Sequence, residues 1–108
     1  NHMLGADVLV FATPIYYYEM SGQMKTLLDR ANPLYSADYR FREVYLLAAA
    51  AEEEDSAWKR AASGLEGWIE CFPEAKLCGV VFGGGYTQAG SIRDSACLQK
   101  AYEAGKSL

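Results

Sequence analysis

The chain has 108 residues, of which 51% are hydrophobic and 22% charged, and its formal net charge is −4. This length supports one folded domain and is too short for two separate cores. The 10 basic residues are outnumbered by 14 acidic ones and form no cluster, which argues against nucleic acid or a membrane surface as a partner. Because the apolar runs are far shorter than the roughly 20 residues of a membrane helix and no signal-peptide layout is present, we expect a cytoplasmic protein.

The first three residues, Asn-His-Met, read as a vector remnant followed by a start methionine, because the periodic pattern begins only at Leu4. We therefore expect a single domain over residues 4–108. The only histidine of the chain is His2. The domain would then hold no imidazole for Ser-His or Cys-His catalysis or for a histidine-based zinc site.

The cysteines are odd in number and lack CxxC spacing. They are Cys71, Cys78 and Cys97. This pattern favours buried, reduced thiols over disulfides or a metal site.

Three apolar segments predict β-strands. Asp7 to Thr13 is a continuous apolar run rich in β-branched and aromatic residues, which is typical of a parallel strand covered on both faces. Arg42 to Ala50 and Lys76 to Phe82 predict a second and a third strand. The glycine-rich stretch from Gly83 to Gly90 predicts a flexible loop after the third strand.

Helical patterns alternate with these strands. The first helix is expected to begin after Ser21 as N-cap and to end at Asn32-Pro33. Its apolar stripe comprises Met24, Leu27, Leu28 and Ala31. The last helix is expected to be capped by Ser91. It carries Ile92, Ala96, Ala101 and Tyr102.

The middle helix follows the acidic run from Glu52 to Asp55 and ends at Pro73. We interpret the acidic run as charges that favour a helix N-terminus, rather than as catalytic or metal-binding carboxylates. The apolar stripe of this helix comprises Trp58, Ala61, Ala62, Leu65, Trp68, Ile69 and Phe72.

The alternation of strands and helices predicts right-handed crossovers and a parallel sheet with helices on both faces. Ligands of such sheets bind at the carboxyl ends of the strands. The loops that start at Thr13, Ala50 and Gly83 are therefore the candidate functional regions. In the first loop, Pro14 and three consecutive tyrosines could offer backbone N–H groups and aromatic faces to a flat, polar ligand. The alternative is that the tyrosines only pack the loop.

The segments Ala6-Asp7, Thr13-Pro14-Ile15-Tyr16, Ser21-Gly22-Gln23-Met24-Lys25 and Asp29-Arg30 carry a resemblance to a known family. The sequence resembles the flavodoxin-like NAD(P)H-dependent FMN reductases, including the iron-sulfur flavoprotein branch. The resemblance implies an α/β fold with a three-layer, flavodoxin-like parallel sheet. Because the family's first two strands and its phosphate-binding loop have no counterpart before Leu4, we expect only the C-terminal portion, truncated to about three strands and three helices.

In this family the loop after the third strand lines the flavin, and the loop after the fourth strand borders the flavin ring on another side. The resemblance therefore implies the following cofactor-binding residues: Thr13, Pro14, Ile15, Tyr16, Tyr17, Ala50, Ala51 and Glu52. It assigns Lys25, Asp29 and Arg30 to fixing the helix and a subunit contact. It implies no catalytic side chain and no metal, because the cysteines do not match the cluster pattern of the iron-sulfur branch.

The implied function is that of an FMN-dependent NAD(P)H oxidoreductase, in which FMN accepts hydride from NAD(P)H and passes electrons onward. Without the phosphate-binding loop, we expect the chain alone to bind FMN weakly if at all and to be inactive. Two alternatives stay open. One is a flavodoxin-like electron carrier without substrate turnover, and the other is a non-catalytic half-domain that needs a second chain.

The strand from Asp7 to Thr13 also carries an expectation about assembly. In the flavodoxin strand order 2-1-3-4-5, loss of the first two strands leaves this apolar strand at an edge with unpaired backbone groups. No lysine or proline between Val8 and Ala12 protects that edge. We therefore expect a homodimer in which the strand pairs antiparallel with its own copy to give one six-stranded sheet.

Overall fold

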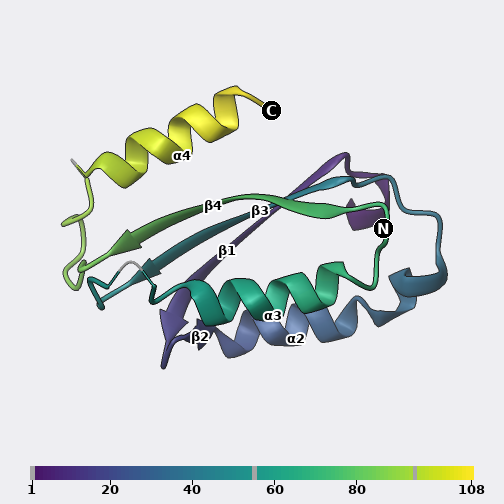
Figure 1. Cartoon of the computed structure of the whole chain (residues 1–108), viewed down its shortest axis with the longest axis horizontal. Helices are drawn as coiled ribbons and strands as arrows, with labels where there is room; N and C mark the ends of the chain where they lie inside the picture. Colours follow the sequence, from purple (N-terminus) through teal and green to yellow (C-terminus); the bar gives the residue numbers. More distant parts are fainter. Residues whose placement is uncertain (1, 55, 94) are drawn as a thin grey trace.

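The computed structural model describes residues 2–54, 56–93 and 95–108, and Figure 1 shows its elements along the chain. In chain order these are α1 (His2–Gly5), β1 (Val8–Tyr16), β2 (Glu19–Met20), α2 (Gly22–Arg30), the 3₁₀ helix η1 (Asn32–Ser36), β3 (Glu43–Ala50), α3 (Lys59–Ile69), β4 (Lys76–Gly84) and α4 (Ala96–Lys106). The vector origin of residues 1–3 stays a prediction, and the structure places His2 and Met3 in α1. No helix within the described residues is both long and apolar enough to cross a membrane.

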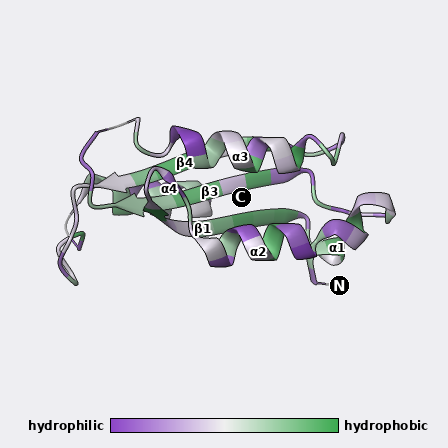
Figure 2. Cartoon of the chain, turned by 90° about the horizontal axis from the view of Figure 1, so that it is seen from below, coloured by the Kyte–Doolittle hydropathy of each residue, from purple (hydrophilic) through white to green (hydrophobic). Residues whose placement is uncertain are grey.

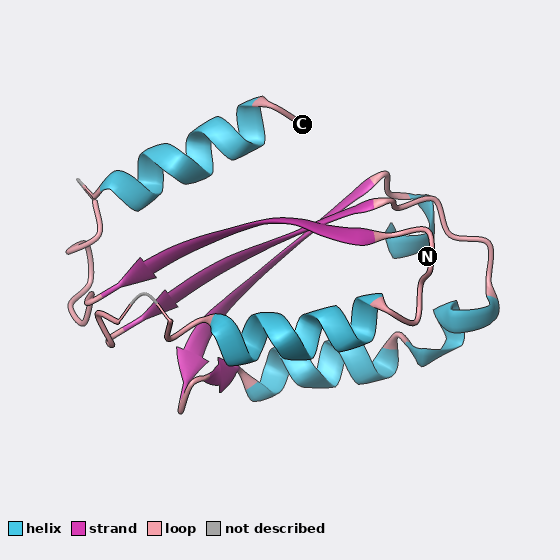
Figure 3. Ribbon diagram, in the orientation of Figure 1, coloured by secondary structure: helices cyan, strands magenta, loops and turns pink. Residues whose placement is uncertain are grey.

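The sheet has the order β2-β1-β3-β4. β1 pairs with β3, and β3 with β4, in parallel, whereas β2 forms a short antiparallel hairpin with the end of β1. Figure 3 shows α2 and α3 on one face of the sheet and α4 on the other. The structure thus confirms the predicted α/β class and the mainly parallel, flavodoxin-like sheet.

The core lies between the sheet and the α2–α3 layer. Alternate residues of β1 and β3 point into it, as the period of two in a strand requires. α2 and α3 add buried apolar residues of their own, and hydrophobic and hydrophilic residues alternate along both ribbons in Figure 2. The indole N–H of Trp68 on α3 donates to the carbonyl of Leu28 on α2 at 3.1 Å. The buried core residues of these elements are Leu9, Phe11, Val44, Leu46, Ala48, Ala50, Met24, Leu28, Ala61, Ala62, Leu65 and Ile69.

The end of β1 differs from the prediction. The strand does not stop at Thr13 but continues through Pro14 to Tyr16. On the side away from β3, no strand among the described residues pairs with β1 from Val8 to Pro14. Proline has no N–H to donate, and it is tolerated at such an unpaired strand edge because no hydrogen bond is lost there. Tyr17 and Tyr18 then form a two-residue turn into β2.

The predicted starts of the last two helices are also wrong. α3 begins at Lys59 and has no acidic residue in its first turn, so Glu52 to Glu54 lie in the preceding loop. Asp55 lies outside the described residues. α4 begins after Ser95 rather than Ser91, because the Ser91 hydroxyl donates to the Gln88 carbonyl (2.7 Å) within the turn before the helix.

Three further predictions are corrected in detail. β4 continues beyond Phe82 to Gly84, so the first glycines belong to the strand. Leu27, expected on the buried stripe of α2, is 45% exposed. Cys71 and Cys78 are exposed and Cys97 is half-buried, so the thiols are free but not buried as predicted.

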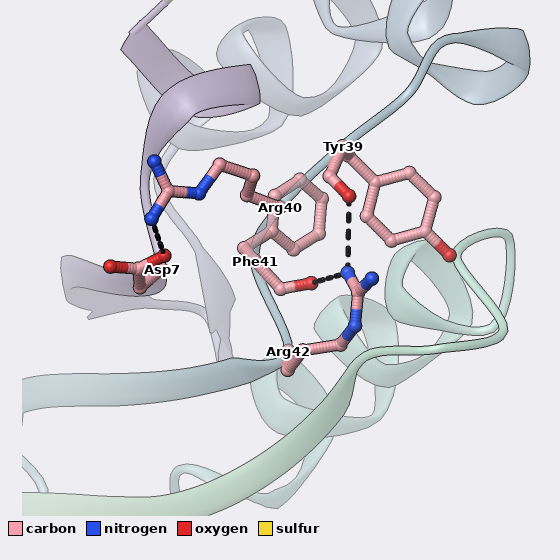
Figure 4. Close-up of polar contacts among 5 residues, drawn as sticks. All are labelled: Asp7, Tyr39, Arg40, Phe41 and Arg42. Carbon is pink, nitrogen blue, oxygen red and sulfur yellow. Dashed lines mark hydrogen bonds and ion pairs between the residues drawn. The ribbon is translucent and has the colours of Figure 1, made fainter.

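Two arginines lie at the amino ends of β1 and β3, and one of them, Arg40, joins the two ends (Figure 4). Arg40 Nη2 lies 2.6 Å from Asp7 Oδ1. Arg42 Nη1 donates to the carbonyl oxygens of Tyr39 and Phe41, each at 3.0 Å. These contacts stabilise the segment that leads into β3 and tie it to the start of β1.

Candidate cofactor-binding site

The loops after β1, β3 and β4 lie together at the carboxyl ends of these strands, where their arrowheads lie in Figure 1. The Tyr18 hydroxyl donates to Glu52 Oε2 at 3.3 Å and joins the first loop to the second. The N–H of Gly85 donates to the Glu52 carbonyl (3.1 Å), and that of Tyr86 to the Ala50 carbonyl (3.3 Å). The topology therefore brings together the three regions that the sequence singled out.

The turn between β1 and β2 has an unusual backbone. Tyr17 and Tyr18 both have positive φ angles, of 51° and 65°. Hairpin turns of this kind normally carry Gly, Asn or Asp, because the left-handed conformation costs other residues about 1–2 kcal/mol each. Such strain is concentrated at functional sites. In this turn the aromatic side chains are exposed to solvent, since Tyr17 is 98% exposed and Tyr16 58% exposed.

Tyr18 anchors this turn to the β3–α3 loop. Besides its hydrogen bond to Glu52, its ring lies 5.9 Å from the guanidinium carbon of Arg60 on α3. The Glu52 carboxylate raises the pKa of the Tyr18 phenol, because a phenolate beside it would be repelled and would lose the hydrogen bond. The neutral phenol of Tyr18 thus donates a hydrogen bond that ties the hairpin to the β3–α3 loop.

Thr13 and Ser21 form a buried polar pair that attaches α2 to β1. The Ser21 N–H donates to Thr13 Oγ1 at 2.9 Å, and Ser21 Oγ accepts from the Met24 N–H at 3.1 Å. The second bond confirms Ser21 as the N-cap of α2. The Thr13 hydroxyl also donates to the Pro14 carbonyl (2.8 Å), so it is already engaged within the chain.

The other predicted site residues differ in exposure. Ile15 is half-buried and Ala50 is buried, whereas Pro14, Ala51 and Glu52 are exposed. Thr13 and Pro14 also line an apolar slot of about 430 Å³ between the sheet and α4. The full lining is Ala12, Thr13, Pro14, Leu47, Ala48, Ala49, Val81, Gly83, Ile92, Cys97, Leu98 and Ala101.

Sequence reasoning gave Tyr18 no role separate from those of Tyr16 and Tyr17, and it did not single out Arg60. In the sequence, nothing distinguishes Tyr18 from the other two tyrosines of the run. In the structure, Tyr18 is the second residue of a two-residue turn, and this position directs its side chain toward Glu52. Arg60 carried no signal, because its contact with Tyr18 depends on the placement of α3 against the hairpin.

The chemistry of this edge suits the ring of a flavin better than its phosphate. Exposed tyrosine rings can bind a flat heteroaromatic system. The exposed side chains around them include the carboxylates of Glu19, Glu52, Glu53 and Glu54, which would repel a phosphate dianion. Within the described residues, no group of three His, Cys, Asp or Glu side chains is placed to hold a metal ion.

The sequence matches the family model of the NADPH-dependent FMN reductases over residues 1–76. No curated protein matches the sequence. Among solved structures, the chain is similar to the Trp repressor binding protein from Bacillus subtilis, with a TM-score of 0.73 and 25% sequence identity. That similarity covers 93% of this chain and 69% of the other, so it extends beyond the range of the family model.

Proposed function

The chain belongs to the NADPH-dependent FMN reductase family, and we propose on this basis that it acts as an FMN-dependent NAD(P)H oxidoreductase. The observation that carries the proposal is the family match over residues 1–76, which includes both the tyrosine hairpin and the loop from Ala50 to Glu52. Ligands of parallel α/β sheets bind at this carboxyl edge. The strained, exposed aromatic hairpin supports the same location.

The residues of the chain have distinct tasks in this proposal. Tyr16 and Tyr17 stack against the flavin ring and exclude water from its face, while Ala50, Ala51 and Glu52 border the ring on another side. Tyr18 holds the hairpin in place through Glu52. Bound FMN supplies the redox chemistry, which is acceptance of hydride from the nicotinamide and transfer of electrons onward. No side chain of the chain needs to act as an acid or base.

The phosphate group of FMN should add little to binding by this chain. The exposed carboxylates of Glu19, Glu52, Glu53 and Glu54 outnumber the Arg60 guanidinium beside Tyr18, and a phosphate hydrogen bond normally contributes roughly 1.5–3 kcal/mol. We therefore expect FMN and riboflavin, which lacks the phosphate, to bind with weak and similar affinities in fluorescence titrations. FMN binding at least about a hundredfold tighter than riboflavin would show that the chain contains a phosphate site.

A substitution tests the stacking itself. Tyr17→Ala removes an aromatic side chain that is 98% exposed and makes no hydrogen bond to the described residues, so we expect the fold to be retained. We expect riboflavin affinity to fall roughly two- to tenfold, the range of one aromatic stacking contact. Tyr102→Ala is the matched control, because Tyr102 is a 64% exposed tyrosine on α4. Equal riboflavin affinities for the parent chain and Tyr17→Ala would contradict the proposed ring site.

Two alternatives are separated by simple measurements. Sustained NADPH consumption by flavin-loaded protein with an electron acceptor supports an oxidoreductase, whereas flavin binding without consumption supports an electron carrier. A non-catalytic half-domain that binds no flavin and needs a second chain predicts neither flavin binding nor NADPH consumption. The outer side of β1 supports this alternative, because no strand among the described residues pairs with it from Val8 to Pro14. A cytoplasmic location stays a prediction.

A further inference from the structure

The chain exposes more surface than a folded monomer of its size. Its accessible surface is 7162 Å², whereas about 5,900 Å² is expected for a folded chain of 11.9 kDa, an excess of roughly 1,200 Å². The radius of gyration, 14.2 Å, also exceeds the value of about 13 Å for this length. A stable protein–protein interface buries about 800 Å² per partner. The excess is therefore large enough for one such interface.

The outer edge of β1 is the best location for that interface. β3 pairs with β1 from Val8 to Pro14, but on the other side β2 reaches only Ile15 and Tyr16. Among the described residues, no strand pairs with the outer side of Val8 to Pro14. The adjoining sheet face is also open, because α4 packs on β4 and leaves Val10 49% exposed (Figures 1 and 2).

The hairpin fixes which backbone groups of β1 are free. In a two-residue hairpin the residues flanking the turn, here Tyr16 and Glu19, point their N–H and C=O groups at each other. Because these groups alternate in direction along a strand, those of Val8, Val10 and Ala12 point to the same outer side. Pro14 also faces this side, where its lack of an N–H leaves the β1–β3 ladder intact.

We propose that a second copy of this chain pairs antiparallel with β1, with the two-fold axis at Val10. In this register Val10 faces Val10 of the second copy, and Val8 faces Ala12. All three outward N–H and C=O pairs are then satisfied, and the ladder ends before Pro14. The segment Val8 to Ala12 carries no charge, so no like charges oppose each other. This two-fold pairing uses the open β1 edge of both copies at once. No open β1 edge is then left to which a third copy could add.

The pairing is independent of flavin binding, and its first test is the mass of the parent chain in solution. Light scattering after gel filtration is expected to give twice the 11.9 kDa chain mass. Hydrogen exchange should show the amides of Val8 and Ala12 protected, and their protection should fall on dilution as the dimer dissociates. A monomer throughout the accessible concentration range, or a dimer with rapidly exchanging Val8 and Ala12 amides, overturns the proposal.

Charge substitutions at the axis test the register. Val10→Lys places two ammonium groups opposite each other in the dimer, whereas the half-exposed position accepts the side chain in a monomer. We expect dimerisation to weaken at least about tenfold, and Val10→Glu to act likewise. Mixing the two variants should restore a heterodimer, because opposite charges then face each other at the axis.

Tyr102→Lys is the matched control, since it adds the same charge on an exposed part of α4 and should leave the dimer intact. Far-UV circular dichroism establishes that each variant is folded, and the exchange measurement on the parent chain does not depend on any variant. If Val10→Lys dimerises as well as the control, or if the mixed charge variants stay monomeric, the β1 pairing is wrong.

Discussion

Tyr17 and Tyr18 share a left-handed backbone conformation, but their side chains do different things. Tyr18 is hydrogen-bonded to Glu52 and lies beside Arg60, so it fixes the turn. Tyr17 is 98% exposed and adds nothing to the packing of the monomer. In a preformed binding surface, one residue holds the strained turn in place while a neighbouring side chain stays exposed to the ligand. Tyr18 and Tyr17 fit these two roles.

The Tyr18–Glu52 contact predicts a late phenol titration. The carboxylate raises the pKa of Tyr18 above the ordinary value of 10.0, so the neutral phenol and its hydrogen bond persist below that pH and are lost as the pH rises through the raised pKa. In an NMR titration, Glu52→Gln should return the pKa of Tyr18 toward 10.0.

Tyr45 supplies the control for this titration. Burial and the nearby Glu43 carboxylate raise its pKa as well, and its hydroxyl donates to Glu43 Oε1 at 3.1 Å. Glu43→Gln should therefore lower the pKa of Tyr45 and leave Tyr18 unchanged. If Glu52→Gln leaves the titration of Tyr18 unaltered, the carboxylate is not the cause of its raised pKa.

These residues also show what sequence could predict at this scale. The Ser21 cap was predictable, because its partner Met24 is three residues away and the signal is local. The Tyr18–Glu52 bond joins residues that are 34 positions apart, so only the folded sheet reveals it. The tyrosine run carried no turn signal, because its residues are not those that favour left-handed turns.

At the scale of elements, strand and helix interiors were predictable but their ends were not. The apolar runs of β1, β3 and β4 and the stripe of α3 are found at the expected places. β1 is nevertheless not covered on both faces as predicted, because its alternate residues, Val10 among them, are exposed. β1 is longer than predicted, because its hairpin with β2 continues the strand beyond Pro14. α3 and α4 begin later in the chain than predicted, because the segments before them form loops and turns. Polar residues occur both in such loops and in the first turn of a helix, so they do not identify where a helix begins.

The end of β4 depends on a close backbone approach that a substitution can test. A Cβ atom on Gly84 would lie 2.5 Å from the Glu52 carbonyl oxygen and 2.7 Å from the Phe82 ring. Gly84→Ala should therefore force the two loops apart and lower the free energy of unfolding by about 1–3 kcal/mol. Urea unfolding followed by tryptophan fluorescence measures the change.

Gly67→Ala is the matched substitution for this experiment. Gly67 lies within α3, and a Cβ there would meet nothing within 4 Å. The alanine should raise the free energy of unfolding by roughly 0.5–1 kcal/mol, because it restricts the unfolded chain and favours the helix. Equal effects of the two alanines would show that the Gly84 approach carries no constraint.

At the scale of the whole molecule, the two faces of the sheet are covered unequally. The alternating pattern correctly predicted helices on both faces, but it gave no measure of how closely each helix packs. α2 and α3 bury Met24, Leu28 and the α3 stripe against the sheet, whereas none of the α4 residues is buried. Packing of this kind depends on which strand each helix crosses, and the hydrophobic period does not contain that information.

This asymmetry predicts that α4 opens without the rest of the protein. α4 packs on β4 beside the apolar slot, and a helix of 11 residues has little stability of its own in water. In native-state hydrogen exchange we expect α4 amides to exchange through a local opening that is insensitive to low denaturant. Amides of β3, the central strand, should exchange only with global unfolding and respond steeply to denaturant. If the amides of α4 and β3 share one opening free energy and one denaturant dependence, then α4 belongs to the cooperative core.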